Sequence, residues 1–401
     1  MIDYTDALRE VLKRAGPLGS ESVPVDRAPG RTLARDIRAR APIPAFAKAT
    51  MDGYAVRAAD TRPAVGSAFT ELEVTGDLPA GRVAYRAVGP GKAVRIMTGA
   101  PLPKGADAVV MVEDTERVGG SVRIMSTVDP GENTGRPGED VERGELVLRK
   151  GALIGPAETG MLAALGYASV PVARRPRVCV IATGDEIVEP GRKARSGQIR
   201  NSNGHALLAL ALQAGAKASY LGIARDRRAS LEAKIRKARR AEILVLSGGV
   251  SVGDYDLVKD QLKALGVRAV FWQVRIKPGK PVFFGLRGRE LVFGLPGNPT
   301  SAMVTFHLFV RPALDRMLGR RESGLRAGKA VLEGEIDLEP GRMQFLRGVL
   351  AGAGPEIRVS PFPDQKSGVL KSMVGSQVLI IAPAEARRLE KGQEVEILFM
   401  D

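Results

Sequence analysis

From Arg174 to about Met317 the sequence alternates strand-like and helix-like segments, and few folds accommodate such a pattern. Short apolar runs such as RVCVIA and EILVLS alternate there with helix-length patterns such as NGHALLALALQAG and YDLVKDQLKALG. Because a helix between two strands lets them run parallel, this pattern predicts a mainly parallel sheet with helices on both faces. A long helix from Pro299 to Met317 is expected to kink at Pro312.

The flanking regions have a different texture. Residues 3–15 place apolar side chains on one helical face before Gly16-Pro17, which predicts a short amphipathic helix. From 23 to about 175, short β-like runs are divided by Gly, Pro and Asp turns, and from Gly328 the β texture returns. The chain therefore reads as α/β plus β, with a small barrel or sandwich at its C-terminal end.

Composition limits the classes of function. The chain has 60 Lys and Arg against 45 Asp and Glu, and the net charge of +15 favours anionic partners such as nucleic acid, anionic lipid or phosphorylated small molecules. Aromatic residues are only 4% and no RNP-like run appears, which argues against nucleic acid. The acidic N-terminus and the lack of an apolar run of about 18 residues predict a cytoplasmic protein without membrane spans.

The cysteine and histidine residues offer little chemistry. One cysteine, Cys179, excludes an intrachain disulfide, and with only His205 and His307 a structural zinc site is excluded as well. Cys179 lies inside an apolar run and is interpreted as a core residue rather than a nucleophile. His307 is interpreted as a packed or partly exposed helix residue, and His205 as part of a helix start.

Three glycine-rich loops follow strands of the α/β region, where ligands bind in open parallel sheets. In the first, residues 247–253, Gly248 and Gly249 let backbone N–H groups turn toward an anion, and Ser247 and Ser251 add hydroxyls. It predicts a phosphate site, with an ordinary βα turn as the alternative. The second, residues 183–186, ends in Asp185 and Glu186, which suit Mg²⁺ or a solvated turn.

The third loop, residues 295–301, places Asn298 to cap a helix and Pro299 at its first position. A capped helix start and an anion site that includes Gly297 both remain open. Upstream, Lys277 and Lys280 lie on a segment stiffened by prolines, which can present ammonium groups to an oxyanion or form a solvated basic turn.

Nine motifs in order resemble the molybdopterin molybdenumtransferase family, which includes the gephyrin E domain, over almost the whole chain. They are MDGYAV (51–56), RIMTGAPLPKGADAVVMVE (95–113), RPGEDV (136–141), TGDE (183–186), NSN (201–203), GGVSVGDYD (248–256), KPGKP (277–281), GLPGNPTSA (294–302) and FLRGVL (345–350).

The resemblance implies a multidomain, elongated subunit. Its expected parts are a split domain of residues 1–45 and 144–175, an inserted β-rich domain of 46–143, a three-layer α/β molybdopterin-binding domain of 176–322 and a C-terminal β-barrel domain of 323–401. It also implies a homodimer with shared active-site clefts, transient contacts with the adenylylating enzyme and with apo-molybdoenzymes, and neither nucleic acid nor membrane as a partner.

The reaction implied by the resemblance is Mg²⁺-assisted insertion of molybdate into adenylylated molybdopterin, with AMP released. The residues matched to catalytic positions are Asp52, Thr98, Asp140, Glu186, Asp226, Asp256, Lys277 and Lys280, with Glu186 and Asp256 as metal ligands. Those matched to substrate binding are Ser247, Gly248, Gly249, Ser251, Gly297, Asn298, Pro299, Arg342, Arg347, Ser367 and Ser372.

The chain departs from the family pattern at Ala47 and Lys48, and at Lys366, where a small residue is common. These changes make the local charge more positive and bear on oxyanion affinity and on the choice between molybdate and tungstate. Two alternatives to metal insertion are adenylyl transfer to molybdopterin, which requires only the α/β region, and a gephyrin-like scaffold.

Overall fold

The computed structural model describes residues 1–401 apart from 64, 239, 250–256, 353–355 and 401. The chain forms two compact units. Unit 1 comprises Met1–Arg35, Lys150–Gly155 and Val170–Asp401, and unit 2 comprises Asp36–Arg149 and Pro156–Ser169. The division into four domains is finer than this one and stays a prediction.

The centre of unit 1 is a six-stranded sheet in the order β16-β13-β17-β21-β20-β18. Its strands are β13 (Arg177–Thr183), β16 (Lys217–Ala224), β17 (Ile243–Ser247), β18 (Arg268–Phe271), β20 (Phe283–Arg287) and β21 (Glu290–Leu295). Strands β16, β13, β17 and β21 run parallel, and β20 runs antiparallel to both its neighbours. The mainly parallel sheet is thus confirmed.

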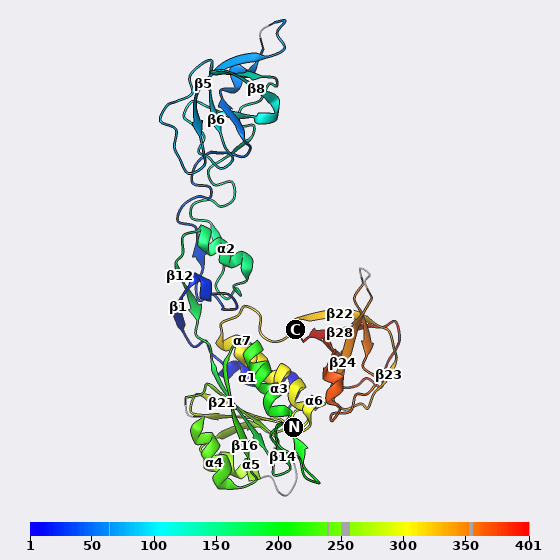
Figure 1. Ribbon diagram of the computed structural model, residues 1–401. Coiled ribbons are helices and arrows are strands. Elements are labelled where there is room, and N and C mark those ends of the chain that lie inside the picture. Colours follow the sequence, from blue (N-terminus) through cyan, green and yellow to red (C-terminus); the bar gives the residue numbers. More distant parts are fainter. Residues whose placement is uncertain (64, 239, 250–256, 353–355, 401) are drawn as a thin grey trace. The chain divides into compact units, whose positions relative to one another are not determined.

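Helices cover both faces of this sheet (Figure 1). On one face lie α1 (Tyr4–Arg14), α3 (Asn203–Gln213), α6 (Pro299–Thr305) and α7 (Arg311–Met317), and on the other α4 (Arg228–Lys237) and α5 (Leu257–Ala264). Since side chains alternate along a strand, Ile243 and Val245 of β17 pack toward the first group and Leu244 and Leu246 toward the second. The result is the expected three-layer α/β arrangement.

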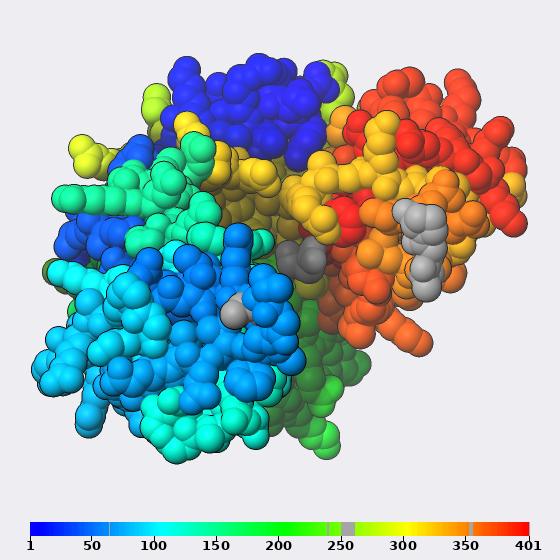
Figure 2. All heavy atoms as spheres, turned by 90° about the horizontal axis from the view of Figure 1, so that it is seen from above, coloured from blue at the N-terminus to red at the C-terminus, as the bar shows by residue number. Residues whose placement is uncertain are grey.

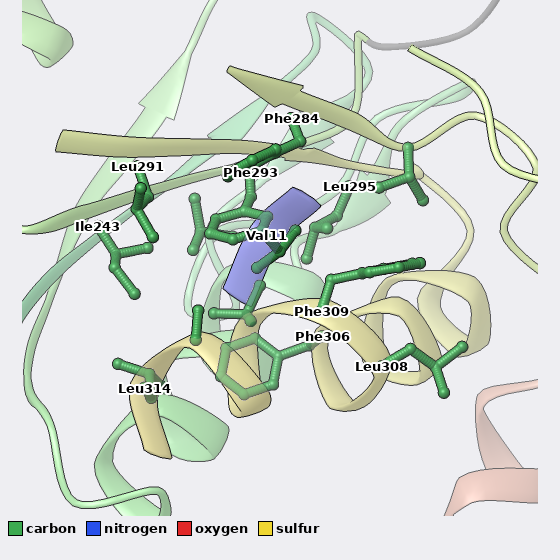
Figure 3. Packing of buried hydrophobic residues seen from close by; sticks show 14 of the residues in the cluster. Val11, Ile243, Phe284, Leu291, Phe293, Leu295, Phe306, Leu308, Phe309 and Leu314 are labelled. Atoms are coloured by element: carbon green, nitrogen blue, oxygen red, sulfur yellow. The ribbon is translucent and has the colours of Figure 1, made fainter. Parts of the chain in front are cut away.

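Aromatic side chains fill the larger of the two cores (Figure 3). Phe284 and Phe293, on neighbouring strands, lie with their ring centroids 4.9 Å apart, and Phe309 packs on Phe271 at 6.2 Å. Truncating a buried phenylalanine to alanine costs about 3–5 kcal/mol, so this core anchors the strands whose ends carry the site.

The expected long helix from Pro299 to Met317 is present in three pieces, α6, a π-helical turn (Phe306–Val310) and α7. Pro312 has no N–H to donate to a carbonyl of the preceding turn, which weakens the α-helical ladder there. The irregularity therefore takes the form of a wider turn just before Pro312, and α7 restarts with the proline in its first turn.

The C-terminal part of unit 1 is a closed five-stranded barrel, as expected. Its strands are β22 (Ala327–Leu332), β24 (Met343–Ala351), β25 (Arg358–Pro361), β26 (Val378–Ala382) and β28 (Glu394–Phe399), and β24 closes it by pairing with both β25 and β26. These residues, orange to red, form a continuous group in Figure 2. Strand β19 (Ile276–Lys277) adds to β24 in parallel, with Lys277 opposite Gln344.

The other elements of unit 1 are short. They are the strand pairs β1 (Ser20–Pro24) with β12 (Ser169–Ala173), β14 (Ile187–Val188) with β15 (Ile199–Arg200) and β23 (Ile336–Asp337) with β27 (Arg388–Leu389), and the 3-10 helices Val25–Arg27 and Leu370–Met373.

Unit 2 is mostly β, as its sequence texture predicts. One six-stranded sheet has the order β7-β4-β6-β5-β9-β8. Its strands are β4 (Gly53–Val56), β5 (Thr70–Leu78), β6 (Lys92–Ile96), β7 (Ala108–Met111), β8 (Thr115–Val118) and β9 (Ser121–Ile124). The remaining elements are β2 (Ile37–Arg38) with β11 (Leu146–Leu148), β3 (Lys48–Ala49) with β10 (Thr134–Gly135), the 3-10 helices Ala58–Thr61 and Val112–Asp114, and α2 (Pro156–Ala164).

Among the described residues, none of the helices combines the length and the apolar character that a bilayer crossing requires.

Candidate active site

The strand order of the α/β sheet determines where a ligand can bind. The chain passes from β13 to β16 on one side and then returns to β17 on the other. At such a reversal the loops after the two central strands separate and leave a crevice beyond their carboxyl ends. The loops that follow β13, β17 and β21 are the three glycine-rich loops of the sequence.

The loop after β17 requires glycine at its first turn. Gly248 has φ +93°, and a Cβ there would lie 2.8 Å from the carbonyl oxygen of Thr183. Its N–H donates to the carbonyl of Leu295 at 3.0 Å, and a Cβ on Gly297 would lie 3.8 Å from its Cα. The predicted site residues Gly248, Gly249 and Gly297 thus lie in adjacent backbone, while Ser251 and Asp256 fall outside the described residues.

Asn203 ties two of these loops together. Its Nδ2 donates to Ser247 Oγ at 2.9 Å and to the carbonyl oxygen of Gly297 at 2.7 Å. Ser247 is 3% exposed, so its hydroxyl serves this bond at the floor of the loops. The sequence alone predicts no role for Asn203, although this residue lies in the motif NSN (201–203), which is the available signal.

Carboxylates gather at the ends of β13 and β16, in a group here called the acidic edge: Asp185, Glu186 and Asp226. Asp185 N–H donates to Asp226 Oδ2 at 3.2 Å, and Asp226 N–H donates to Asp185 Oδ1 at 3.4 Å. The loop is held further by Arg225, whose Nη1 donates to the carbonyls of residues 184, 185 and 187 at 3.3, 3.0 and 3.1 Å.

The carboxylate of Glu186 folds back against Gly184, close to where a side chain on that glycine would begin. The acidic edge therefore offers the carboxylates of Asp185 and Asp226 on two adjoining loops, with Glu186 next in the chain, and one or two carboxylates are what proteins use to hold Mg²⁺. Within the part of the chain that the structure describes, no group of three or more His, Cys, Asp or Glu has the geometry of a metal site. The fit is to a partly hydrated ion, not to a closed cage.

Cations line a cavity of about 410 Å³, here called the basic cavity. Its charged side chains are Lys277, Lys280, Arg342 and Lys366, and its polar ones include Asn298, Ser301, Gln365 and Ser367. Gly279 between the two lysines has φ +100° and approaches Thr305 so closely that a Cβ would collide with it. The lysine-bearing segment is therefore pressed against the first helical turns after Pro299.

Within the described part of the chain, one carboxylate, that of Glu339, pairs with a lysine of the basic cavity. Lys277 Nζ lies 2.9 Å from Glu339 Oε2, and this ion pair lowers the pKa of Glu339 below its ordinary value. For Lys280, no ion pair exists among the described residues. The described side chains of the cavity, taken with Glu339, thus carry a net positive charge.

Asn298 is the N-terminal boundary residue of α6, but its side chain does not cap the helix. Its Nδ2 instead donates to Ser367 Oγ at 2.8 Å, and Thr300 N–H donates to the Ser367 carbonyl at 3.3 Å. The prediction of a capping bond is wrong, because the Ser367 carbonyl in the C-terminal part of the chain offers the Thr300 N–H another acceptor. Arg347 and Ser372, two further predicted substrate-binding residues, are fully buried.

In unit 2 the structure brings two predicted residues together. Thr98 donates to Asp52 Oδ1 through its backbone N–H at 2.7 Å and through its hydroxyl at 2.6 Å. These two bonds stabilise the carboxylate and lower the pKa of Asp52. Asp140 is exposed, and its N–H donates to the carbonyl of Ile43 at 3.0 Å.

The remaining titratable candidates have structural surroundings. Burial raises the pKa of the half-buried Cys179 thiol, which suits a packed residue. Burial lowers the pKa of His307 to about 4. His205 lies in α3 with its Nε2 3.3 Å from Glu189 Oε2.

Comparison with known proteins assigns the whole chain. Residues 2–166 match the MoeA N-terminal region (domain I and II), 179–316 a probable molybdopterin binding domain, and 329–400 the MoeA C-terminal region (domain IV). The molybdopterin molybdenumtransferase of Bacillus subtilis (strain 168) is 35% identical over 404 residues, which cover 100% of this chain and 94% of the relative. The chain belongs to the molybdopterin molybdenumtransferase family.

Other relatives agree. The molybdopterin molybdenumtransferase of Staphylococcus aureus (strain Mu50) is 33% identical over 406 residues, covering 100% of this chain and 96% of the relative. This family member is also similar to a crystal structure of the molybdopterin biosynthesis MoeA protein from Pyrococcus horikoshii, with a TM-score of 0.86, 36% identity and coverage of 100% and 99%. It thus has both the fold and the family of molybdenum cofactor biosynthesis proteins.

Proposed function

We propose that this chain inserts molybdate into the dithiolene of adenylylated molybdopterin and releases AMP in a Mg²⁺-dependent reaction. The observation that carries the proposal is the basic cavity beside the glycine-rich loops. A cavity lined by four cationic side chains suits a dianionic oxyanion, and loops of backbone N–H groups at strand ends suit the phosphates of a nucleotide-linked substrate.

The reaction has two parts. Oxygen ligands of molybdate are exchanged for two dithiolene sulfurs, each departing oxygen leaving as water with protons from the thiols and solvent, and molybdenum keeps its oxidation state. A water oxygen attacks the phosphoanhydride, whose P–O bond breaks to release AMP. Neither part needs a covalent intermediate with the protein, so binding, orientation and charge neutralisation are the protein's contribution.

Each group of residues has a distinct task in this proposal. Lys277 and Lys280 hold the oxyanion, and Arg342 and Ser367 face it from the barrel side of the cavity. Gly248 and Gly249 direct backbone toward the substrate phosphates, with Asn203 holding their loop against Gly297. Glu186 and the neighbouring carboxylates would hold Mg²⁺, which when bound neutralises the charge of the pyrophosphate.

The proposal extends to the assembly. A cytoplasmic homodimer in which Asp52, Thr98 and Asp140 complete the partner's cleft accords with the placement of Asp52 and Thr98 on one exposed surface of unit 2. Transient contacts with the adenylylating enzyme and with apo-molybdoenzymes would deliver the substrate and accept the product.

Reconstitution tests the proposal. Purified chain, adenylylated molybdopterin, Mg²⁺ and molybdate are mixed, and AMP release and activation of an apo-molybdoenzyme are measured. Molybdate-dependent AMP release is expected. Conversion of ATP and free molybdopterin to the adenylylated form, without AMP release, would favour the adenylyltransferase alternative, and capture of a receptor tail with no turnover would favour the scaffold.

A further inference from the structure

A buried charge stands out in the C-terminal barrel. Arg347 lies in the middle of β24 and is 0% exposed. Its burial lowers the pKa to about 10, so the guanidinium remains charged at neutral pH. Transferring a charge from water into a protein interior costs several kcal/mol unless other groups compensate, and an apolar residue of similar volume often gives a fold at least as stable. Fold stability alone therefore does not explain an arginine here.

The contacts of the guanidinium all lead to one segment of the chain. Nε donates to Ser372 Oγ at 3.1 Å, and Nη2 donates to the carbonyl oxygens of Asp364 and Lys366, both at 3.1 Å. Nη1 is buried and has no hydrogen-bond partner among the described residues. The side chain thus binds main-chain and hydroxyl oxygens of residues 364–372 and forms no ion pair within the described part of the chain.

The main chain of Arg347 is also hydrogen-bonded to this segment, through the side chain of Gln365. Arg347 N–H donates to Gln365 Oε1 at 3.0 Å, and Gln365 Nε2 donates to the Arg347 carbonyl at 2.9 Å. Gln365 Nε2 also donates to the carbonyl of Phe362 at 2.8 Å. An amide side chain that pairs with both polar groups of one residue acts as an additional strand partner, so the segment is held to β24 from two directions.

This segment forms one wall of the basic cavity. Gln365, Lys366 and Ser367 line it together with Lys277 and Lys280. Ser367 also accepts hydrogen bonds from Asn298 and Thr300 at the start of α6, so it links the barrel to the α/β part of the cavity.

We propose that Arg347 is a positioning residue, which holds residues 364–372 so that Ser367 and Lys366 meet an oxyanion bound at the lysine pair. Ser372 is its hydrogen-bond acceptor and not a ligand of the substrate. The role rests on the proposed function, because it assumes that the cavity binds an oxyanion. It replaces direct substrate binding, the role that the sequence resemblance implies for both residues.

The test uses the full chain and three variants: Arg347→Lys, Ser372→Ala and Arg358→Lys. Lysine keeps the charge but replaces the planar fork by one ammonium group. Ser372→Ala removes a single acceptor at a buried position outside the cavity lining. Arg358→Lys is the matched control, because Arg358 lies in the same barrel, exposed and paired with Glu356.

Molybdate alone is the first probe, by calorimetry, and AMP release is the second. Arg347→Lys is expected to weaken molybdate binding about tenfold and Ser372→Ala about threefold, as hydrogen bonds to a charged group are lost. The half-saturating concentration of adenylylated molybdopterin should change by less than about twofold in both. Hydrogen exchange at the Thr300 and Phe362 amides, which donate to Ser367 and Arg347 carbonyls, should accelerate.

Three results would overturn the proposal. Direct contact with the oxyanion would weaken molybdate binding in Arg347→Lys and leave Ser372→Ala unchanged. A merely structural role would raise the half-saturating concentrations of both substrates together. Faster hydrogen exchange with unchanged molybdate binding would show that residues 364–372 do not contribute to molybdate binding. If Arg347→Lys does not fold, Ser372→Ala decides. Failure of the proposed function is distinct, because the chain would then release no AMP even where the variants bind molybdate more weakly.

Discussion

The acidic edge and the basic cavity are built in different ways. The acidic edge comes from two loops at the ends of adjacent parallel strands, and backbone N–H groups and Arg225 hold it in place. The basic cavity takes its side chains from three stretches that are distant in sequence, around residues 277–281, 296–301 and 342–367. The carboxylates thus lie in local turns, whereas the cationic side chains gather where the α/β part and the C-terminal barrel meet.

Removing a lysine from the basic cavity gives the largest expected effect. Lys277→Ala and Lys280→Ala should each lower kcat/KM for molybdate about 100-fold, because charge stabilisation in a preorganised site is lost. The concentration of Mg²⁺ for half-maximal AMP release should not change. The exposed Lys391→Ala in the barrel is the control. A shift of similar size in the Mg²⁺ dependence would show that the basic cavity and the acidic edge do not act independently.

The next prediction concerns the stability of the fold, which should depend on pH through the buried His307. Burial holds His307 neutral with a pKa of about 4, against about 6.5 in an unfolded chain. Unfolding therefore takes up a proton below pH 6.5, and stability is full above that pH and falls as the pH drops toward 4. The free energy of unfolding should be about 2 kcal/mol lower at pH 5 than at pH 7.

Urea titrations at the two pH values check this expectation. His307→Leu should lose this part of the pH dependence, because an apolar side chain at the same buried position binds no proton. An unchanged difference between pH 7 and pH 5 in the variant would assign the effect to other groups.

A neutral substitution of Glu186 tests whether the acidic edge binds Mg²⁺. Glu186→Gln keeps the shape of the side chain and removes its charge, so half-maximal AMP release should need about ten times more Mg²⁺. The dependence on molybdate should stay as in the unmodified chain. Glu385→Gln, an exposed change in the barrel, is the matched control. A rise in the molybdate requirement alone would place Glu186 with the basic cavity instead.

The smallest expected effect comes from removing the charge of Glu339, which pairs with Lys277 of the basic cavity. Glu339 is 78% exposed in its ion pair with Lys277, and exposed pairs are weak and screened by salt. Glu339→Gln frees Lys277 and should tighten molybdate binding about threefold at low salt, with the gain shrinking as salt rises. Unchanged binding at low salt would show that Glu339 does not compete with the oxyanion.

Much of this arrangement was predictable. The alternation from Arg174 to Met317 predicted the three layers, and the positions of glycines after apolar runs predicted loops at strand ends, where Gly248 indeed takes a conformation that other residues rarely adopt. Two partners were missed. Asn203 bonds to Ser247, which is 44 residues away, and Glu339 pairs with Lys277, which is 62 residues away. No local sequence pattern indicates contacts over such distances in the chain.

The order of layers, the family and the residue types of the site can all be inferred from the amino-acid sequence. Those features follow from local periodicity, turn chemistry and motifs, each read within a few residues. Two features become visible only in the folded chain: Asn298 binds Ser367 instead of capping its own helix, and Arg347 is buried in the barrel. The physical reason is that a side chain bonds to whatever acceptor packing brings within about 3 Å, and the chain distance to that acceptor does not enter.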